Sequence, residues 1–123
     1  MATVRAIYAA FARRDLEAMI GHIAPDCQLE VPGTASRAGR TGPYLGPEGI
    51  RQYFADAERV WSELTLVADD VRAASNGVAV FGHVEGQSGG QVIRRRVVWL
   101  WQLRDGKAVR VTANDLGELP PPA

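Results

Sequence analysis

The sequence predicts an α+β domain in which helices pack on one face of a curved sheet. Apolar residues recur at helical spacing in the first sixty residues, whereas four strand-like segments follow from residue 64 onward. The turn-forming stretches SNG, QSGG and RDG separate these later segments. An order of helix, helix, strand, helix and then an antiparallel meander favours helices laid against one sheet. The chain of 123 residues suits one domain with one core.

The predicted helices are identified by their apolar stripes and end signals. Residues 3–13 carry apolar residues at i, i+3, i+4, i+7 and i+8, namely Val4, Ile7, Tyr8, Phe11 and Ala12. Asp15 is placed to cap a second short helix over residues 16–23, which we expect to end near Pro25. A third helix is predicted over residues 47–64, with Pro47 at its start and the stripe Ile50, Tyr53, Phe54, Ala57 and Trp61.

The remaining segments predict strands and one long loop. Residues 27–33, CQLEVPG, alternate and end in Pro-Gly, which indicates a first strand. Residues 33–47 predict a loop, and loops of that length are often functional, so Tyr44 is expected either in a lid or as a loop anchor. The four later strands are predicted over residues 64–74, 78–86, 92–103 and 108–116. Residues 1–118 then form the single domain, and residues 119–123 a flexible tail.

Composition argues against several classes of protein. Fourteen basic and fourteen acidic residues cancel, whereas general nucleic-acid or membrane-surface binders usually carry a basic excess. No apolar run approaches the length of about 18 residues that spans a membrane. Cys27 is the only cysteine, which fits a reducing compartment, and we expect a cytoplasmic protein. Cys27 also lacks metal-ligand spacing with the two histidines, and no phosphate-binding motif occurs, so we expect no metal and no cofactor.

The faces of the strands depend on the lengths of the turns between them. A three-residue turn at SGG would pair His83 with Arg95. A three-residue turn at DGK would pair Val97 with Asp115. A slip of one residue would reverse a strand's faces. With these registers one face holds Phe81, His83, Glu85, Arg95, Val97, Trp99, Trp101, Val111 and Asp115.

Four stretches together resemble a known superfamily: YAAFARRDLEAMIGHIAPDCQLEVPG, YLGPEGIRQYF, NGVAVFGHVEG and VVWLWQLRDGKAVRV. They are similar to the ketosteroid-isomerase-like, or nuclear transport factor 2-like, superfamily, and most resemble its SnoaL-like polyketide cyclase branch. The resemblance implies a cone-shaped, cystatin-like fold: a curved mixed or antiparallel sheet wraps around the N-terminal helices and encloses a pocket. It also implies that the face defined above lines the pocket and that Tyr8, Phe11, Tyr53 and Trp61 close it.

The superfamily includes isomerases, cyclases, dehydratases, epoxide hydrolases and binding modules, so the fold alone does not assign a function. Where ketosteroid isomerases have their general base this chain has Val31, and their oxyanion-hole acid would fall near Trp99. The Asp-Arg-Asp set of limonene-type epoxide hydrolases is incomplete. SnoaL-type cyclases use a histidine and an aspartate, for which His83 and Asp115 are the candidates.

Each ionisable candidate has two interpretations. Asp115 is a general acid or base with a pKa raised by apolar walls, or else an exposed carboxylate or ion partner of Arg95. His83 is a proton shuttle, or a half-buried histidine held by Glu85 or Arg95. Arg95 binds an oxyanion of the substrate, or else it forms an internal ion pair. Glu85 is that arginine's partner or solvent-exposed.

The leading hypothesis is a cofactor-free enzyme that cyclises, isomerises or dehydrates a hydrophobic carbonyl compound. Its catalytic residues would be Asp115, His83 and Arg95, and its substrate-binding residues Trp99, Trp101, Phe81, Glu85, Val97, Tyr8, Tyr53, Trp61 and Val31. The alternative is a non-catalytic module that binds a hydrophobic small molecule, and a third possibility is a protein–protein adaptor.

A homodimer is expected through the outer face of the sheet, because apolar residues on both faces of a single sheet need two covers. Arg94 and Arg96 would be contacts at its rim. The apolar residues assigned to that outer face are Val78, Val80, Val84, Val98 and Leu100.

Overall fold

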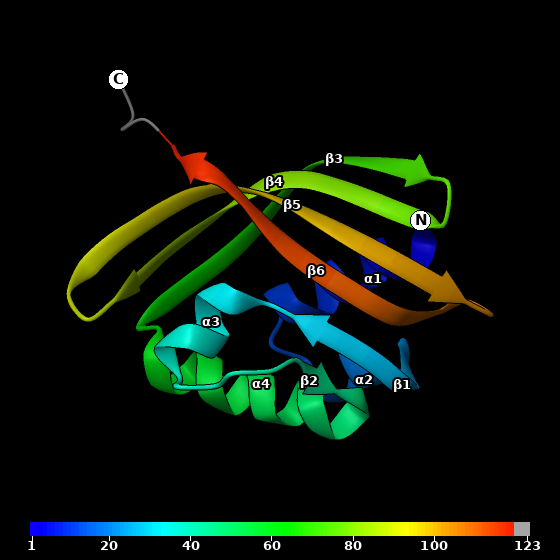
Figure 1. The fold of residues 1–123 in the computed structure, drawn as a ribbon, viewed down its shortest axis with the longest axis horizontal. Helices are drawn as coiled ribbons and strands as arrows, with labels where there is room; N and C mark the ends of the chain where they lie inside the picture. The colour runs from blue at the N-terminus through cyan, green and yellow to red at the C-terminus, as the bar shows by residue number, and fades with distance from the viewer. Residues whose placement is uncertain (120–123) are drawn as a thin grey trace.

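The computed structural model describes residues 1–119 and confirms the α+β class. Four helices and two strands make up the first half of the described chain, and the last four strands follow one another directly (Figure 1). The helices are α1 (Ala2–Ala12), α2 (Leu16–Ile20), α3 (Pro32–Arg37) and α4 (Gly46–Val60). The strands are β1 (Ile23–Glu30), β2 (Tyr44–Leu45), β3 (Glu63–Ala74), β4 (Gly77–Ser88), β5 (Gln91–Arg104) and β6 (Lys107–Glu118).

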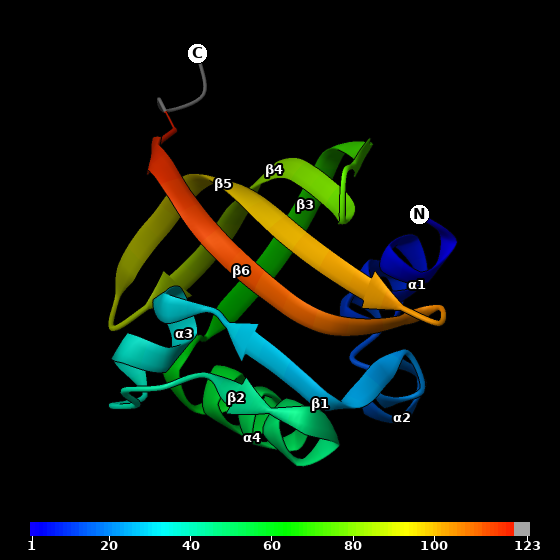
Figure 2. The same ribbon diagram turned by 45° about the vertical axis from the view of Figure 1, so that its right-hand side comes forward.

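The strands form one curved, open sheet in the order β2-β1-β6-β5-β4-β3. Only β1 and β6 pair in parallel, and the other neighbours are antiparallel, so the sheet is mixed. The long strands β3 to β6 arch over the helices (Figures 1 and 2). The concave side of the arch therefore faces the helices, and no helix within residues 1–119 covers the convex side.

Local signals place the helices as expected, with small shifts at their ends. Asp15 caps α2 by accepting a hydrogen bond from the backbone N–H of Ala18 at 3.1 Å, as predicted. Pro47 stands in the first turn of α4. That helix ends at Val60, earlier than expected, because Trp61 has extended backbone angles and leads into β3. No helix within residues 1–119 is long and apolar enough to cross a membrane.

The expectation of a loop over residues 33–47 was wrong in part. The helix α3 begins at Pro32, and the short strand β2 pairs with β1 before α4 begins. β1 also starts at Ile23, four residues before the predicted strand. Proline at the first helical position is favourable, since its missing N–H has no intrahelical partner there. The predicted tail lies outside the described residues, except for Leu119.

The β4–β5 hairpin differs from its predicted register by one residue. Gly89 and Gly90 both have positive φ and form a two-residue turn, so His83 pairs with Arg96 rather than Arg95. Since side chains alternate, the predicted faces of β4 are exchanged. Val78, Val80 and Val84 face the core, and not the outside as expected, whereas Phe81, His83 and Glu85 face outward.

The β5–β6 register was predicted correctly, although the turn was not. Asp105 and Gly106 make a two-residue turn with positive φ, which would by itself shift the pairing. A bulge between Gln102 and Leu103 cancels this shift and restores the predicted pairing. Val97 therefore pairs with Asp115, as expected, and Trp101 pairs with Val111.

A buried carboxylate joins the segment after α3 to α4. Asp56 is only 6% exposed, and it accepts hydrogen bonds from Arg40 and, at 2.8 Å, from the Tyr44 hydroxyl. The hydrogen bond from Arg40 is the main reason that the pKa of Asp56 lies below its usual range. Of the two interpretations of Tyr44, the structure supports the loop anchor, because its side chain is buried against α4.

Candidate functional site

A cavity of about 450 Å³ lies between the concave face of the sheet and the helices. Its walls are mainly apolar, and all three tryptophans of the chain contribute to it. It is open at one end, where charged residues from β5, β6 and α3 line it. A mostly apolar cavity of this size with a few polar groups at one end is typical of small-molecule sites.

The deep wall is built from an aromatic cluster. The ring of Tyr8, on α1, meets Trp99 at 5.5 Å and Trp101 at 5.8 Å between centroids, both edge to face. The indole N–H of Trp101 donates to the Tyr8 hydroxyl at 3.2 Å. Burial raises the pKa of Tyr8 far above its usual value, so this hydroxyl stays protonated. The Tyr8 hydroxyl therefore acts in the cavity as a neutral hydrogen-bonding group.

The helical side of the cavity is also aromatic. Tyr53 on α4 is buried, which raises its pKa to about 12. Trp61, directly after α4, donates its indole N–H to the Thr34 hydroxyl at 3.0 Å. This contact fixes α3 against the end of α4 and makes one side of the opening.

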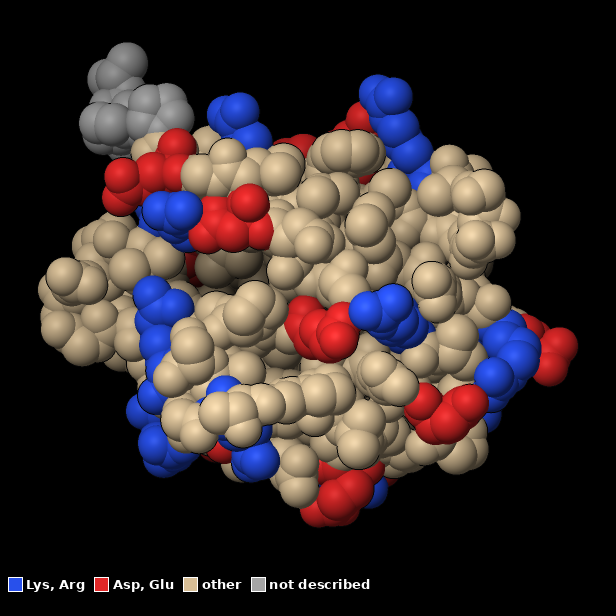
Figure 3. Space-filling model, viewed as in Figure 1, with Lys and Arg blue, Asp and Glu red and all other residues tan. Residues whose placement is uncertain are grey.

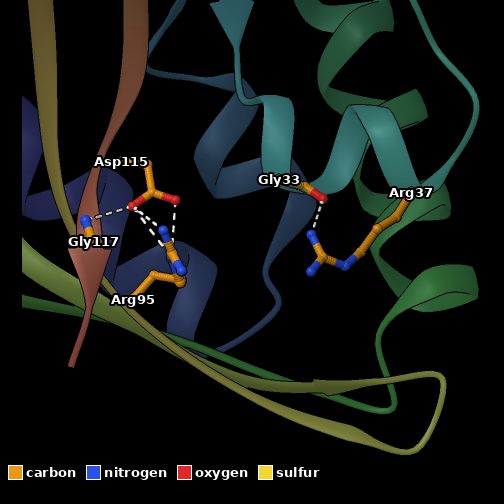
Figure 4. A network of polar contacts seen from close by, with 5 residues as sticks. All are labelled: Gly33, Arg37, Arg95, Asp115 and Gly117. Carbon is orange, nitrogen blue, oxygen red and sulfur yellow. Dashed lines mark hydrogen bonds and ion pairs between the residues drawn. The ribbon is translucent and has the colours of Figure 1, made fainter. Parts of the chain in front are cut away.

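Arg95 and Asp115, both in the cavity lining, form an ion pair (Figure 4). Arg95 Nε donates to Asp115 Oδ2 at 3.0 Å and Arg95 Nη2 to Oδ1 at 3.0 Å, a bidentate arrangement. The backbone N–H of Gly117 adds a third donor at 2.7 Å. The side chains are 39% and 54% exposed, which places the pair at the open end of the cavity.

The environment of Asp115 is dominated by the ion pair with Arg95. The hydrogen bonds from Arg95, with a smaller contribution from Gly117, hold the pKa of Asp115 below its usual range and outweigh the opposing effect of desolvation. The raised pKa of the first interpretation was therefore wrong, and the ion pair with Arg95 named in the second is present. Asp115 is ionised at neutral pH, so it can accept a proton but not donate one.

Phe81, His83 and Glu85 do not line the cavity. The one-residue difference in the β4–β5 register turns them to the convex face. There His83 Nδ1 lies 3.1 Å from Asp69 Oδ2, and its Nε2 lies 3.4 Å from Glu85 Oε1. This is the half-buried histidine of the second interpretation, although Glu85 contacts Arg94, at 3.3 Å, rather than Arg95.

The other predicted pocket residues line the cavity together. They are Tyr8, Phe11, Val31, Tyr53, Trp61, Arg95, Val97, Trp99, Trp101, Val111 and Asp115. The sequence interpretation missed the contribution of α3, because that segment was taken as loop, although Pro32 after an extended residue is a helix-start signal. It also missed β3, where Leu64 and Leu66 alternate toward the cavity.

No cluster within residues 1–119 brings together three or more histidine, cysteine, aspartate or glutamate side chains in a way that could hold a metal ion. The polar side chains that line the cavity are the carboxylates of Asp115 and Glu118, the guanidinium groups of Arg37, Arg94 and Arg95, and the hydroxyls of Tyr8, Thr34, Ser36 and Tyr53.

Solved structures share this architecture. An NTF2-like protein of unknown function from Burkholderia pseudomallei is 26% identical, with a TM-score of 0.83 over 94% of this chain and 88% of its own. TerC, co-crystallised with polyporic acid, is 30% identical, with a TM-score of 0.81 over 92% of this chain and 88% of its own. A putative polyketide cyclase from Xanthomonas campestris, 21% identical with a TM-score of 0.74 over 91% and 86%, shares the fold.

Among curated proteins, none matches this chain. The profile of the SnoaL-like domain matches residues 4–111, which is most of the sequence. That span contains both the aromatic wall and Arg95, whereas Asp115 lies just beyond it. The profile match and the shared architecture agree with the resemblance in the sequence: the chain belongs to the SnoaL-like domain family.

Proposed function

We propose that this protein is a cofactor-free enzyme that cyclises, isomerises or dehydrates a hydrophobic carbonyl compound by proton transfer at the Arg95–Asp115 pair. The observation that carries the proposal is a carboxylate–guanidinium pair at the open end of a large aromatic cavity. The apolar walls would bind the body of the substrate, and the pair would meet its carbonyl group. The structure of a putative polyketide cyclase with the same fold supports this class of reaction.

In this scheme Asp115 removes a proton from the carbon beside the carbonyl. The electron pair of the broken C–H bond moves to the carbonyl oxygen and makes an enolate, which Arg95 stabilises. Cyclisation then joins the enolate carbon to a second carbonyl carbon of the same molecule, whose oxygen takes up the electron pair and the proton held by Asp115. Isomerisation returns the proton to another carbon. Dehydration expels a hydroxyl group from the carbon next to the enolate carbon, and this group takes the proton and leaves as water. Because its pKa is depressed, Asp115 is a weak base, so the proposal favours substrates with already acidic C–H bonds, such as carbons between two carbonyl groups.

Substrate binding would also adjust the base. When one of the two hydrogen bonds that Arg95 donates to Asp115 is replaced by a hydrogen bond to the substrate oxygen, the charged form of Asp115 is less stabilised. Its pKa would then rise toward the ordinary value, and it would become a stronger base in the complex than in the free protein. His83 has no part in this scheme, since it lies on the convex face.

The competing function is a non-catalytic module that binds a hydrophobic small molecule. Its support is specific: Val31 and Trp99 line the cavity at the positions where related isomerases have their acids, and neither is a carboxylic acid. The co-crystal of TerC with polyporic acid supports binding of an organic acid in such a fold. Both functions use the same cavity and differ only in whether the ligand is converted.

A ligand panel separates these functions. Because all three tryptophans line the cavity, ligand binding should change their fluorescence in a saturable way. We would titrate polyporic acid, linear 1,3-diketones, steroidal ketones and fatty acids, and examine each incubated mixture by mass spectrometry and NMR. Conversion of a bound diketone, detected by NMR when mass is conserved, supports the enzyme. Saturable binding with no conversion of any ligand supports the module, and absence of binding by all classes would contradict both.

We also propose that two copies of the chain associate through the convex face of the sheet. On that face Phe81 is 43% and Leu100 is 48% exposed, in adjacent strands. Apolar side chains at the centre of an uncovered sheet favour a second layer. A symmetric dimer would bring this patch against its own copy.

Replacing Leu100 by Glu should convert the dimer into a monomer, because a carboxylate would be buried in the apolar contact. Light scattering coupled to size exclusion would show half the mass of the wild-type particle, with an unchanged circular dichroism spectrum. Leu45→Glu is the matched control, since Leu45 is 61% exposed on the edge strand β2, and it should leave the mass unchanged. A monomeric wild-type protein at high concentration would contradict the proposal.

A further inference from the structure

Three arginines line the cavity, and they differ in whether a carboxylate lies within ion-pair distance of the guanidinium group. Arg95 is paired with Asp115, and the Arg94 side chain contacts Glu85 at 3.3 Å. Arg37 on α3 has no carboxylate within ion-pair distance among the residues that the structure describes. Its polar contact is neutral, a hydrogen bond from Nη1 to the backbone oxygen of Gly33 at 2.8 Å (Figure 4).

The acidic residues of the opening are associated with Arg95. Asp115 is bound to it, and Glu118, the other carboxylate in the lining, acts on Arg95 electrostatically. The α3 side therefore presents a positive charge that no described acidic group neutralises. Figure 3 shows basic and acidic side chains beside a hollow in the surface. A cation at the edge of a mostly apolar cavity is complementary to an amphiphilic anion.

Arg37 is also held in position before any ligand binds. Its guanidinium carbon lies 4.6 Å from the centroid of the Trp61 ring, a stacked cation–π contact. Trp61 is itself buried and fixed by its hydrogen bond to Thr34. A guanidinium that is already ordered loses little conformational entropy when it binds an anion, and it keeps N–H donors beyond the one directed at Gly33.

We propose that Arg37 recognises the ionised acidic group of the ligand, whose apolar body fills the aromatic cavity. The preferred ligands are then hydrophobic organic acids, with a carboxylate or another oxyanion at the α3 side of the opening, rather than neutral ketones. This inference rests on the proposed function only in requiring that the cavity be the ligand site. It holds for an enzyme and for a binding module alike.

Two fluorescent dyes with the same aromatic body test this inference. The anion 8-anilinonaphthalene-1-sulfonate and the neutral N-phenyl-1-naphthylamine differ only in the sulfonate group. We would measure Kd and stoichiometry of both dyes for the wild type and Arg37→Gln. The control is Arg5→Gln, which removes the same charge from the exposed side of α1.

The expected result is that Arg37→Gln weakens binding of the anionic dye by about fivefold to tenfold, the effect of a partly exposed charged hydrogen bond. The Kd of the neutral dye should change by less than about twofold. Arg5→Gln should likewise change the Kd of each dye by less than about twofold. Near-ultraviolet circular dichroism would verify that the aromatic packing of Arg37→Gln is unchanged.

Other outcomes would overturn the inference. Equal weakening of the binding of both dyes by Arg37→Gln would mean that Arg37 only supports the position of Trp61 in the cavity lining. Equal weakening of the anionic dye by both variants would reduce the effect to net charge, and no weakening would exclude Arg37 from recognition. If neither dye binds the wild type at one site per chain, the cavity is not a ligand site, and the proposed function fails as well. Absence of turnover alone leaves the inference intact.

Discussion

Replacing Asp115 by Asn is expected to lower turnover by at least about 100-fold while ligand binding changes little, because a general base contributes on the order of 10²–10⁴ to rate. The amide oxygen can still accept hydrogen bonds from Arg95 and Gly117, so the local structure should persist. Turnover of the ligand identified in the panel, together with its fluorescence-derived Kd, measures the two effects separately. Unchanged turnover would remove Asp115 from the mechanism.

The matched control for this variant is Asp26→Asn. Asp26 is also an exposed aspartate bound to an arginine, with Arg104 Nη2 at 2.7 Å, and the pKa of Asp26 is likewise lowered. Asp26 is not among the residues that line the cavity. The Asp26→Asn variant should therefore keep wild-type turnover. An equal loss of turnover in both variants would point to a general loss of structure.

The pH dependence follows from the sign of the pKa shift. Asp115 must be ionised to act as a base, and Arg95 lowers its pKa, so kcat/KM should stay high until the pH falls below the ordinary range of a carboxyl group. Replacing Arg95 by Gln should move this acid limb to higher pH, because the pKa of Asp115 is no longer depressed. A pH profile of both proteins checks the direction.

Replacing Asp56 by Ala is expected to lower the free energy of unfolding by about 3 kcal/mol, at the low end for breaking a buried ion pair because Arg40 remains partly exposed. The change leaves the Tyr44 hydroxyl without its acceptor and Arg40 without its carboxylate. Urea denaturation at pH 7 measures the loss. A wild-type unfolding midpoint would show that the buried cluster does not stabilise this segment.

Glu17→Ala provides the comparison for Asp56. Glu17 accepts a hydrogen bond from Arg51 at 3.0 Å, but its side chain is 74% exposed, so its loss should cost less than about 1 kcal/mol. The Asp56 contribution should also depend on pH. Because the pKa of Asp56 is lowered in the folded state, its stabilisation is present at neutral pH and disappears as the pH falls through that lowered value.

The hairpin turns show how far local sequence determines a register. The pair Gly89–Gly90 is itself a two-residue turn signal, and taking SGG as a three-residue turn placed His83 in the cavity. Asp105–Gly106 has the same property, yet there the error was cancelled by the bulge beside Leu103. The first error could have been avoided from sequence, whereas the bulge depends on how β6 packs beside β1 and β5.

The buried cluster of Asp56 shows a different limit. Nothing in the helical pattern of residues 47–64 distinguishes Asp56 from an ordinary solvent-facing acid. Its partners Arg40 and Tyr44 lie 16 and 12 residues earlier, and only the folded path of the chain after α3 brings them together. Arg37 is similar, since its place at the cavity opening depends on the stacking against Trp61.

The sequence by itself determined the fold class, the order of the helices and strands apart from α3 and β2, the family and the aromatic face of β5, because these follow from periodicity and from residues close together in the chain. Only the tertiary structure decided which ionisable groups share the cavity. It turned His83 to the convex face, joined Arg95 to Asp115 and placed Arg37 at the opening. The physical reason is that a one-residue change in pairing reverses the faces of a strand, and a neighbouring charge sets the direction of a pKa.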